Sequence, residues 1–256
     1  MCVIVIKPAD VTIERSDLEA MFRRNRDGMG MAYFLPDGSV RIDKGYMIES
    51  AAVDAVMQHM EKSLVIHFRL TTHGKTCPEQ CHPFVISGDV KEAKTLDRAD
   101  CVLFHNGVIS GYGNDKISDT IHFACQVLSR IPDATVKQEV LCLTGDKFAL
   151  LQEGKIYLVG EFKEYKGLMC SNLHFVTSRV FGYPGTYQGM YGSNWSGRSE
   201  VGGQAVTLAF PAKTKEELER DLADKEAIKE FQLRMEEKVL QQKLQEESEQ
   251  QPFIGS

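Results

Sequence analysis

Residues 1–10, MCVIVIKPAD, place a cysteine directly after Met1 and directly before a run of apolar, β-branched residues. The run VIVI is continuous rather than alternating, which predicts a short buried strand. The cysteine then has two interpretations. It is either a small apolar residue at the start of the strand, or a nucleophile that becomes the first residue when Met1 is removed. The other motifs of the chain have to distinguish between them.

The composition is ordinary for a soluble globular protein. The chain has 256 residues, of which 43% are hydrophobic and 26% charged, and its formal net charge is -6. No apolar run approaches the roughly 20 residues that cross a bilayer, and the start does not have the pattern of a signal peptide. Seven scattered cysteines, an odd number, favour a reducing compartment. We therefore expect a cytoplasmic protein that has neither a membrane nor a nucleic acid as its partner.

Strand-like and helix-like segments mix along the first 180 residues, and several strands are joined by short turns. The expected strands and hairpins are 2–6, 31–45, 63–70, 101–110, 147–162 and 168–181, and the expected helices are 16–25, 48–62 and 118–131. Hairpins join neighbouring strands in antiparallel pairs. This pattern therefore predicts an α+β fold with antiparallel sheets.

The composition changes at about Phe181. Residues 2–181 carry the mixed strands and helices, whereas residues 182–212 are rich in Gly, Ser, Tyr and Asn and predict a flexible linker. Residues 213–248 consist mostly of helix formers, with a capping box near their start, and predict a C-terminal helix. That helix either packs on its own domain or lies in solvent, or it is a coiled-coil or partner-docking segment.

Four polar segments lie at predicted strand ends or helix starts: Cys2, HFRLTTHG (67–74), HNG (105–107) and SDT (118–120). Removal of Met1 would give Cys2 a free α-amine beside its thiol. An α-amine has a reference pKa of about 7.7–8.0, so it can accept the thiol proton at neutral pH. Nucleophile and base would then belong to one residue, as in the N-terminal-amine variants of the catalytic triad.

The remaining segments supply what an amide-cleaving thiol needs. The Asn106 side chain and the Gly107 N–H can stabilise an oxyanion, although an Asn-Gly pair alone is usually a turn. Arg69 suits a carboxylate and Asp119 suits an ammonium group, although Asp119 could equally be a helix N-cap. Together these groups predict a site that holds both charged ends of a free α-amino acid while Cys2 attacks its side-chain carboxamide.

These motifs resemble, in order and spacing, those of class II glutamine amidotransferase domains, which are N-terminal nucleophile (Ntn) hydrolases. The family pattern is a cysteine exposed by methionine removal, H-x-R-x-x-T-x-G, an N/C-H-P segment, H-N-G and S-D-T. Here it stands as Cys2, HFRLTTHG, CHPF (81–84), HNG and SDT, and NRDGMGMAYF (25–34) and GLMCSNLHF (167–175) resemble further segments of the family. The resemblance covers residues 2 to about 180 and is to a stand-alone form of the domain.

The resemblance implies a fold as well as a set of catalytic roles. The implied fold is a four-layer αββα sandwich of two antiparallel sheets. The implied nucleophile is Cys2, with its α-amine as the base, and the implied oxyanion hole is formed by Asn106 and Gly107. The reaction would pass through a γ-glutamyl thioester and give ammonia and glutamate, without a metal or a cofactor.

The resemblance also implies how glutamine is bound. Arg69 would bind its α-carboxylate and Asp119 its α-amine, while Thr72 and His73 would line the loop over it. Two positions depart from the family pattern: Val3 stands where many members have glycine, and Leu70 where many have an aromatic residue. Neither departure removes a catalytic group.

The ammonia needs an acceptor. The roughly 75 residues after Phe181 are too few for the synthetase or transferase domain that consumes it in full amidotransferases. The resemblance therefore implies a separate ammonia-accepting synthetase or ligase, with the C-terminal helix as a candidate for association, or an enzyme that only hydrolyses an amide.

Three alternatives stay open. His73, Cys77, Cys81 and His82 could form a zinc site, although their spacing is not that of a standard structural zinc motif. The substrate could be another γ-glutamyl or acyl amide, although the pair of charged binding groups favours free glutamine. The chain could also be a catalytically silent binding module whose functional surface is the C-terminal helix.

Overall fold

The strand β1 (Val3–Lys7) is buried over its whole length. In the computed structural model, which describes residues 2–176 and 206–209, Val3 and Val5 face one apolar cluster, whereas Ile4 and Ile6 face another. Successive side chains of a strand point to opposite faces. A continuous apolar run such as VIVI is therefore the signature of a strand that is covered on both sides, and the strand predicted from residues 2–6 is confirmed.

The elements of the described residues alternate between strands and helices along the chain. The strands are β1, β2 (Met29–Phe34), β3 (Val40–Tyr46), β4 (Leu64–Phe68), β5 (Phe84–Val85), β6 (Arg98–Ala99), β7 (Cys101–Asn106), β8 (Lys147–Gln152), β9 (Lys155–Val159), β10 (Lys163–Tyr165), β11 (Leu168–Cys170) and β12 (Val206–Ala209). The helices are α1 (Arg15–Arg24), α2 (Glu49–Met57), α3 (Val90–Ala93), α4 (Asp119–Gln126) and α5 (Ala134–Cys142), with the 3₁₀ turns η1 (Pro78–Gln80) and η2 (Leu128–Arg130).

The strands of the described residues form two sheets. The seven-stranded sheet has the order β10-β11-β1-β4-β2-β3-β6, and the five-stranded sheet has the order β12-β9-β8-β7-β5. Every pairing in both sheets is antiparallel. The prediction of an α+β fold with antiparallel sheets is therefore confirmed.

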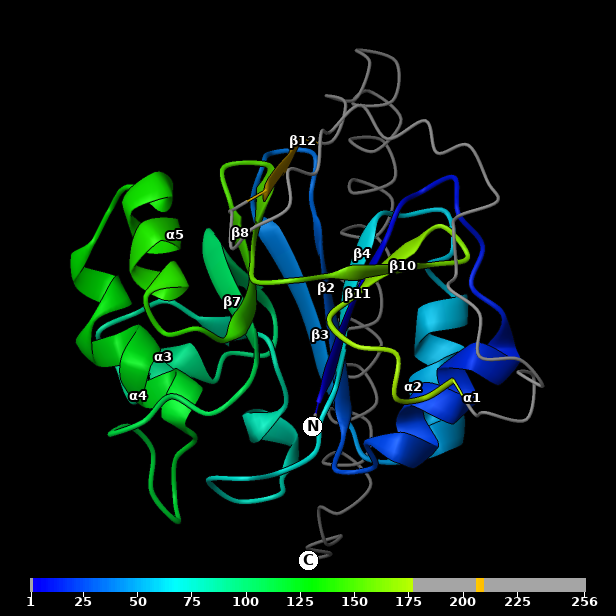
Figure 1. Ribbon diagram of the computed structural model, residues 1–256, viewed down its shortest axis with the longest axis horizontal. Coiled ribbons are helices and arrows are strands. Elements are labelled where there is room, and N and C mark those ends of the chain that lie inside the picture. Colours follow the sequence, from blue (N-terminus) through cyan, green and yellow to red (C-terminus); the bar gives the residue numbers. More distant parts are fainter. Residues whose placement is uncertain (1, 177–205, 210–256) are drawn as a thin grey trace, which may run out of the picture. The chain divides into compact units, whose positions relative to one another are not determined.

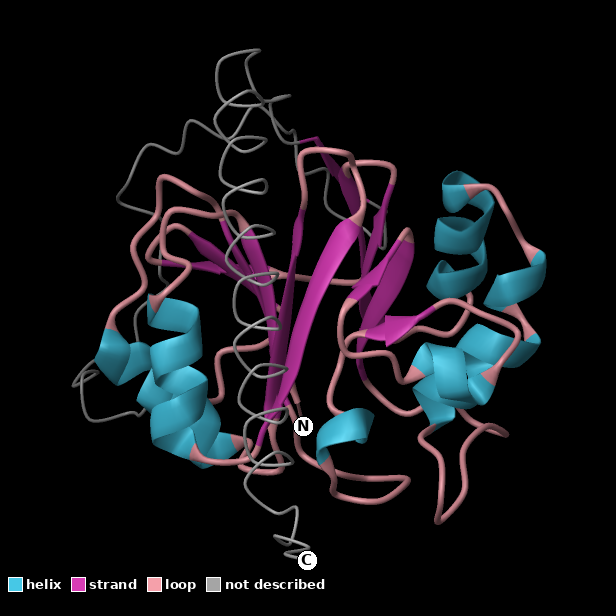
Figure 2. Cartoon of the chain, turned by 180° about the vertical axis from the view of Figure 1, so that it is seen from behind, coloured by secondary structure: helices cyan, strands magenta, loops and turns pink. Residues whose placement is uncertain are grey.

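Four apolar clusters hold the described elements together, and the smallest of them joins β5, α3 and α4. On β4, Ile66 joins the cluster that contains side chains of α1 and α2, whereas Val65 joins the cluster shared by the two sheets. On β8, Leu151 belongs to that shared cluster, and Leu150 belongs to a third cluster with side chains of α4 and α5. The helices α1 and α2 thus cover the seven-stranded sheet, and α4 and α5 cover the five-stranded sheet (Figures 1 and 2).

Some element boundaries differ from those expected. The helix predicted over 118–131 ends at Gln126 and continues as the separate turn η2. Of the strand predicted over 168–181, residues 168–170 form β11 and residues 171–176 are not in a strand, while residues 177–181 lie outside the described residues. The helix α5 was not predicted, although Asp133 is its N-cap and accepts a hydrogen bond of 2.9 Å from the Val136 N–H.

The strand β12 lies inside the predicted linker 182–212 and pairs with β9. The other residues of that linker, and the helix predicted over 213–248, lie outside the described residues, so the predicted domain boundaries stay predictions. In the part of the chain that the structure describes, no helix is both long enough and apolar enough to span a membrane.

Candidate active site

The thiol of Cys2 is held by the backbone at the end of β4. Val3 pairs with Phe68 in the ladder between β1 and β4, so Cys2 lies beside the residues that leave β4. The Leu70 N–H donates to Cys2 Sγ at 3.2 Å, and Sγ–H donates to the Leu70 carbonyl at 3.3 Å. Leu70 therefore contacts the thiol through its backbone atoms. These contacts do not require the aromatic side chain that many family members have at this position.

Burial raises the pKa of the Cys2 thiol, and the Leu70 N–H offsets part of this effect. A thiol with a raised pKa is protonated at neutral pH, whereas the thiolate is the reactive form. Cys2 therefore needs a base to act as a nucleophile.

The backbone of Cys2 is held on its other side by the segment that follows β11. The Asn172 side chain donates to the Cys2 carbonyl at 2.7 Å, and the His174 N–H donates to Asn172 Oδ1 at 3.2 Å. The sequence motif GLMCSNLHF contains Asn172, but no role was predicted for it. A buried asparagine after a short strand was the available signal.

Asn106 is the last residue of β7 and is buried at the junction of the two sheets. Its Nδ2 lies 2.9 Å from Ser171 Oγ, and the same oxygen accepts a 2.9 Å hydrogen bond from the Ile4 N–H. Ser171 therefore connects the strand that carries Cys2 to the strand that carries Asn106. Ser171 also stands in GLMCSNLHF, and no role was predicted for it.

Gly107 follows directly and has no room for a side chain. A Cβ built on Gly107 would overlap the carboxylate of Asp146. Asp146 Oδ2 accepts a hydrogen bond of 3.1 Å from His105 Nε2. The glycine thus lets the carboxylate reach the backbone beside Asn106, and neither His105 nor Asp146 was among the predicted site residues.

Asp119 is the first residue of α4, but it is not the N-cap, because Ser118 Oγ accepts the capping hydrogen bond from the Ile121 N–H. The Asp119 carboxylate is 4% exposed. It accepts hydrogen bonds of 2.7 Å from the Ile109 N–H and 2.9 Å from the Thr120 N–H. A buried carboxylate that is held by neutral donors is suited to bind a cation.

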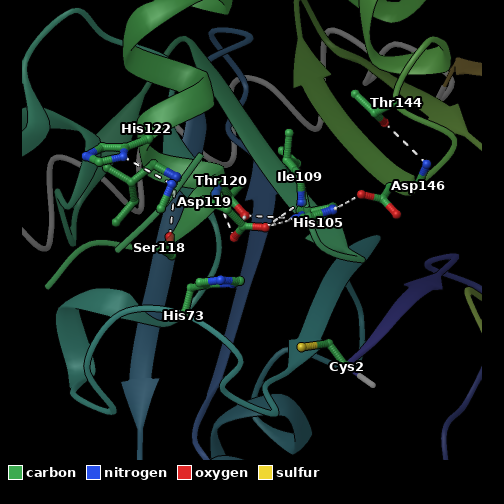
Figure 3. Close-up of polar contacts among 12 residues, drawn as sticks. Cys2, His73, His105, Ile109, Ser118, Asp119, Thr120, His122, Thr144 and Asp146 are labelled. Atoms are coloured by element: carbon green, nitrogen blue, oxygen red, sulfur yellow. Dashed lines mark hydrogen bonds and ion pairs between the residues drawn. The ribbon is translucent and has the colours of Figure 1, made fainter. Parts of the chain in front are cut away.

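His105 connects Asp119 to Asp146. Its Nδ1 lies 2.9 Å from Thr120 Oγ1, and its Nε2 bonds Asp146. Figure 3 shows this chain running from Asp146 through His105 and Thr120 to Asp119, and Cys2 is drawn apart from it. The predicted oxyanion segment and the predicted ammonium-binding residue therefore share one network of side chains.

Arg69 is buried at the end of β4, where its guanidinium donates to the carbonyls of Lys75 at 2.9 Å and His73 at 3.2 Å. It therefore closes the loop that follows β4. In that loop Thr72 is exposed, and His73 is half-buried with an Nδ1 that has no hydrogen-bond partner among the described residues. The predicted contacts of Arg69, Thr72 and His73 with a substrate stay predictions.

The segment considered as a zinc site does not assemble one. Within the described residues, no group of three or more His, Cys, Asp and Glu side chains is arranged to hold a metal. The His82 ring packs on His67 and Phe84, with ring centroids 4.1 and 4.5 Å away. Cys81 Sγ lies 3.9 Å from Met47 Sδ. These side chains belong to the packing between the two sheets and around η1.

Comparisons with known proteins give a likeness in structure but no match in sequence. Neither the protein-family models nor the curated proteins contain a match to this chain. Among solved structures, the chain is similar to the glutamine phosphoribosylpyrophosphate (PRPP) amidotransferase from B. subtilis in complex with ADP and GMP, with 14% sequence identity and a TM-score of 0.44. The match covers 67% of this chain and 42% of that protein. A likeness at this level carries no argument about activity, which has to come from the residues themselves.

Proposed function

We propose that this chain is an Ntn-type glutamine amidotransferase domain that hydrolyses the side-chain amide of glutamine with Cys2 as its nucleophile. The observation that supports this best is the shared hydroxyl of Ser171, which bonds the Ile4 N–H on the strand of Cys2 and the amide of Asn106 at 2.9 Å each. Acyl transfer requires a nucleophile and an oxyanion donor, and this hydroxyl links the strand that follows Cys2 to the residue that would supply the donor. The order of helix pair, sheet, sheet and helix pair supports the four-layer αββα sandwich of that class.

In the proposed mechanism, removal of Met1 frees the α-amine of Cys2. This amine takes the thiol proton, which the raised pKa of the thiol would otherwise retain. The thiolate attacks the side-chain carbonyl carbon of glutamine, and the oxyanion is stabilised by the amide of Asn106 and the N–H of Gly107. Collapse of this intermediate breaks the C–N bond, and the ammonium group of Cys2 returns the proton to the departing ammonia.

The γ-glutamyl thioester that remains is then hydrolysed. Water attacks the thioester carbonyl with the same α-amine as its base, and glutamate leaves as the Cys2 thiol is restored. Arg69 binds the α-carboxylate of the substrate and Asp119 its α-ammonium group, while Thr72 and His73 cover it. No step of this half-reaction uses a metal or a cofactor.

The destination of the ammonia is the second part of the proposal. A separate synthetase or ligase accepts it in the cytoplasm, and the helix predicted over residues 213–248 is the candidate segment for that association. Co-purification from the native host with and without residues 213–248 tests this part independently of the glutaminase reaction.

The test of the first part is glutamate release from glutamine by the purified chain, with its intact mass measured on the same sample. We expect loss of Met1 and an activity that disappears in Cys2→Ala. Cys142→Ala is the matched control, because Cys142 is a half-buried cysteine on α5. Turnover of another γ-glutamyl or acyl amide in place of glutamine would favour a different amidase, and a processed chain without any amidase activity would favour a binding module.

A further inference from the structure

Ser171 occupies the junction of the two sheets directly after β11. It is completely buried, and its backbone is fixed at both ends, because its N–H donates to the Ile4 carbonyl at 2.9 Å and its carbonyl accepts from Lys147 Nζ at 2.7 Å. Its hydroxyl lies 2.9 Å from the Ile4 nitrogen and 2.9 Å from the side-chain nitrogen of Asn106. One hydroxyl group thus sets the separation between the strand of Cys2 and the end of β7.

When Nδ2 of Asn106 faces Ser171, the hydrogen-bonding groups at this junction are not all satisfied. The Ile4 N–H is a fixed donor, so the Ser171 oxygen accepts from it and has one proton left to donate. With Nδ2 of Asn106 also pointing at Ser171, that proton has no acceptor at Asn106. At the same time, Oδ1 of Asn106 is buried without a hydrogen-bond partner in the described part of the chain.

Rotation of the Asn106 amide by half a turn removes both defects. The oxygen and nitrogen of an amide side chain have nearly the same shape, so their assignment follows from the hydrogen bonds that each placement makes. In the rotated placement Ser171 O–H donates to Oδ1 of Asn106. The Nδ2 group then faces the position that Oδ1 had occupied, with two protons free to donate.

We infer that Ser171 is the positioning residue of the oxyanion hole: its hydroxyl holds Oδ1 of Asn106 and thereby directs Nδ2 toward the carbonyl oxygen that Cys2 attacks. This inference rests on the proposed function, since it assigns an orientation to the oxyanion donor of that reaction. Among the described residues the Ser171 hydroxyl bonds only the Ile4 N–H and Asn106, so its effect on the oxyanion passes through Asn106. A donor that acts on the oxyanion stabilises the transition state rather than the bound substrate.

The experiment compares Ser171→Ala with the wild-type chain in glutamine hydrolysis. We expect kcat to fall about 10- to 100-fold with KM unchanged, less than the roughly 100- to 1,000-fold of losing an oxyanion donor outright. Affinity for the γ-aldehyde analogue of glutamine, whose adduct with Cys2 carries the oxyanion, should fall by the same factor. Affinity for the product glutamate and the rate of alkylation by iodoacetamide should not change.

The double variant provides the sharpest control. Because the effect of Ser171 on the oxyanion passes through Asn106, Ser171→Ala combined with Asn106→Ala should be no slower than Asn106→Ala alone. Ser129→Ala is the matched serine control, since its hydroxyl bonds the Cys125 carbonyl on α4 at 2.6 Å and should leave kcat unchanged. If Ser171→Ala does not fold by circular dichroism, Ser171→Cys supplies a weaker donor of similar size and should give an intermediate kcat.

Two results would overturn this inference alone. The first is a wild-type kcat in Ser171→Ala, or in Ser171→Cys if only that variant folds. The second is a double variant whose loss of kcat is the product of the two single losses. A wild-type chain that neither releases glutamate nor binds the aldehyde contradicts the proposed function, and the inference with it. The wild-type measurement therefore distinguishes the two failures.

Discussion

Cys2 is held by backbone groups and neutral amides, whereas Asp119 is held within a chain of side chains that carries two carboxylates and a histidine. The contacts of Cys2 come from Leu70 and Asn172, and the neighbouring hydroxyl of Ser171 is neutral too. The contacts of Asp119 continue through Thr120 and His105 to Asp146. Because burial among neutral groups raises the pKa of the Cys2 thiol, the thiol depends on a base to lose its proton, whereas a site for an ammonium group needs negative charge.

The two regions join at Gly107, so a change there should damage both. In Gly107→Ala the new methyl group overlaps the Asp146 carboxylate, which displaces either Asn106 or the contact between Asp146 and His105. We expect glutamine hydrolysis to fall by more than about 100-fold, the size of losing an oxyanion donor. Steady-state kinetics measures the loss.

The double variant Gly107→Ala with Asp146→Ala tests whether the overlap with the Asp146 carboxylate causes the loss. Removing that carboxylate makes room for the new methyl group, so part of the activity should return. Gly88→Ala is the matched control, because nothing lies within 4 Å of a Cβ at that position. Full activity in Gly107→Ala would show that the carboxylate does not constrain the oxyanion segment.

A change confined to the charged region should affect binding and leave the thiol alone. Asp119→Asn removes the negative charge and one of two accepting oxygens, and a hydrogen bond to a charged group contributes about 1.5–3 kcal/mol. We expect KM for glutamine to rise about 10- to 100-fold, while iodoacetamide still alkylates Cys2 at the wild-type rate. Asp115→Asn, in the exposed loop before α4, is the control. A fall in the alkylation rate would mean that the two regions are not independent.

The junction between the sheets should make stability depend on pH. Burial lowers the pKa of His67 to about 3, and the hydrogen bond of 3.0 Å from its Nε2–H to the His105 carbonyl offsets only part of this effect. Its Nδ1 has no partner among the described residues. As the pH falls, the His67 imidazole is therefore protonated in the unfolded chain before it is protonated in the folded chain, near its ordinary pKa of about 6.5. The free energy of unfolding is largest above that pH and should fall by about 1.4 kcal/mol per pH unit between about 6.5 and about 3.

Urea unfolding at a series of pH values measures this slope in the wild-type chain and in His67→Gln. We expect a smaller slope in the variant, and an unchanged slope in His174→Gln, whose side chain lies on the exposed surface. An equal slope in all three chains would contradict the assignment of the effect to His67. Burial also lowers the pKa of His82, so the variant should keep a part of the slope.

The smallest effect is expected from metal removal. Cys81 and His82 pack on neighbouring side chains, and no group of three or more possible ligands is arranged around a metal in the described part of the chain, so dialysis against a chelator should leave glutaminase activity unchanged. Metal analysis of the purified chain accompanies this measurement. Stoichiometric zinc together with loss of activity on dialysis would restore the zinc site as an alternative.

The fold was largely predictable where one local pattern determines an element. The continuous run in β1 indicated a buried strand, and the turn at Pro36-Asp37-Gly38 indicated the hairpin of β2 and β3. Element boundaries that depend on tertiary contacts, such as the end of α4 at Gln126, were harder to predict from the sequence. The helix α5 was missed because its start depends on one capping residue, Asp133, between two weakly periodic segments.

The candidate site was predictable where a residue type already suggests its chemistry. Cys2, Arg69 and Asp119 stood out by charge or reactivity at strand and helix ends. Asp146 was not found, because a single aspartate after a glycine resembles any surface turn until folding brings it to His105. The role of Ser171 was not predicted, because its hydroxyl contacts Ile4 and Asn106 only after folding brings their two strands together.

The most direct test of the account is the mass of the N-terminal peptide after the chain has reacted with a diazoketone analogue of glutamine. We expect a peptide that begins at Cys2, carries one adduct on its sulfur and is protected from labelling by excess glutamine. A peptide that retains Met1, or an adduct on another cysteine with Cys2 unmodified, would contradict the claim that Cys2 is an N-terminal nucleophile for glutamine.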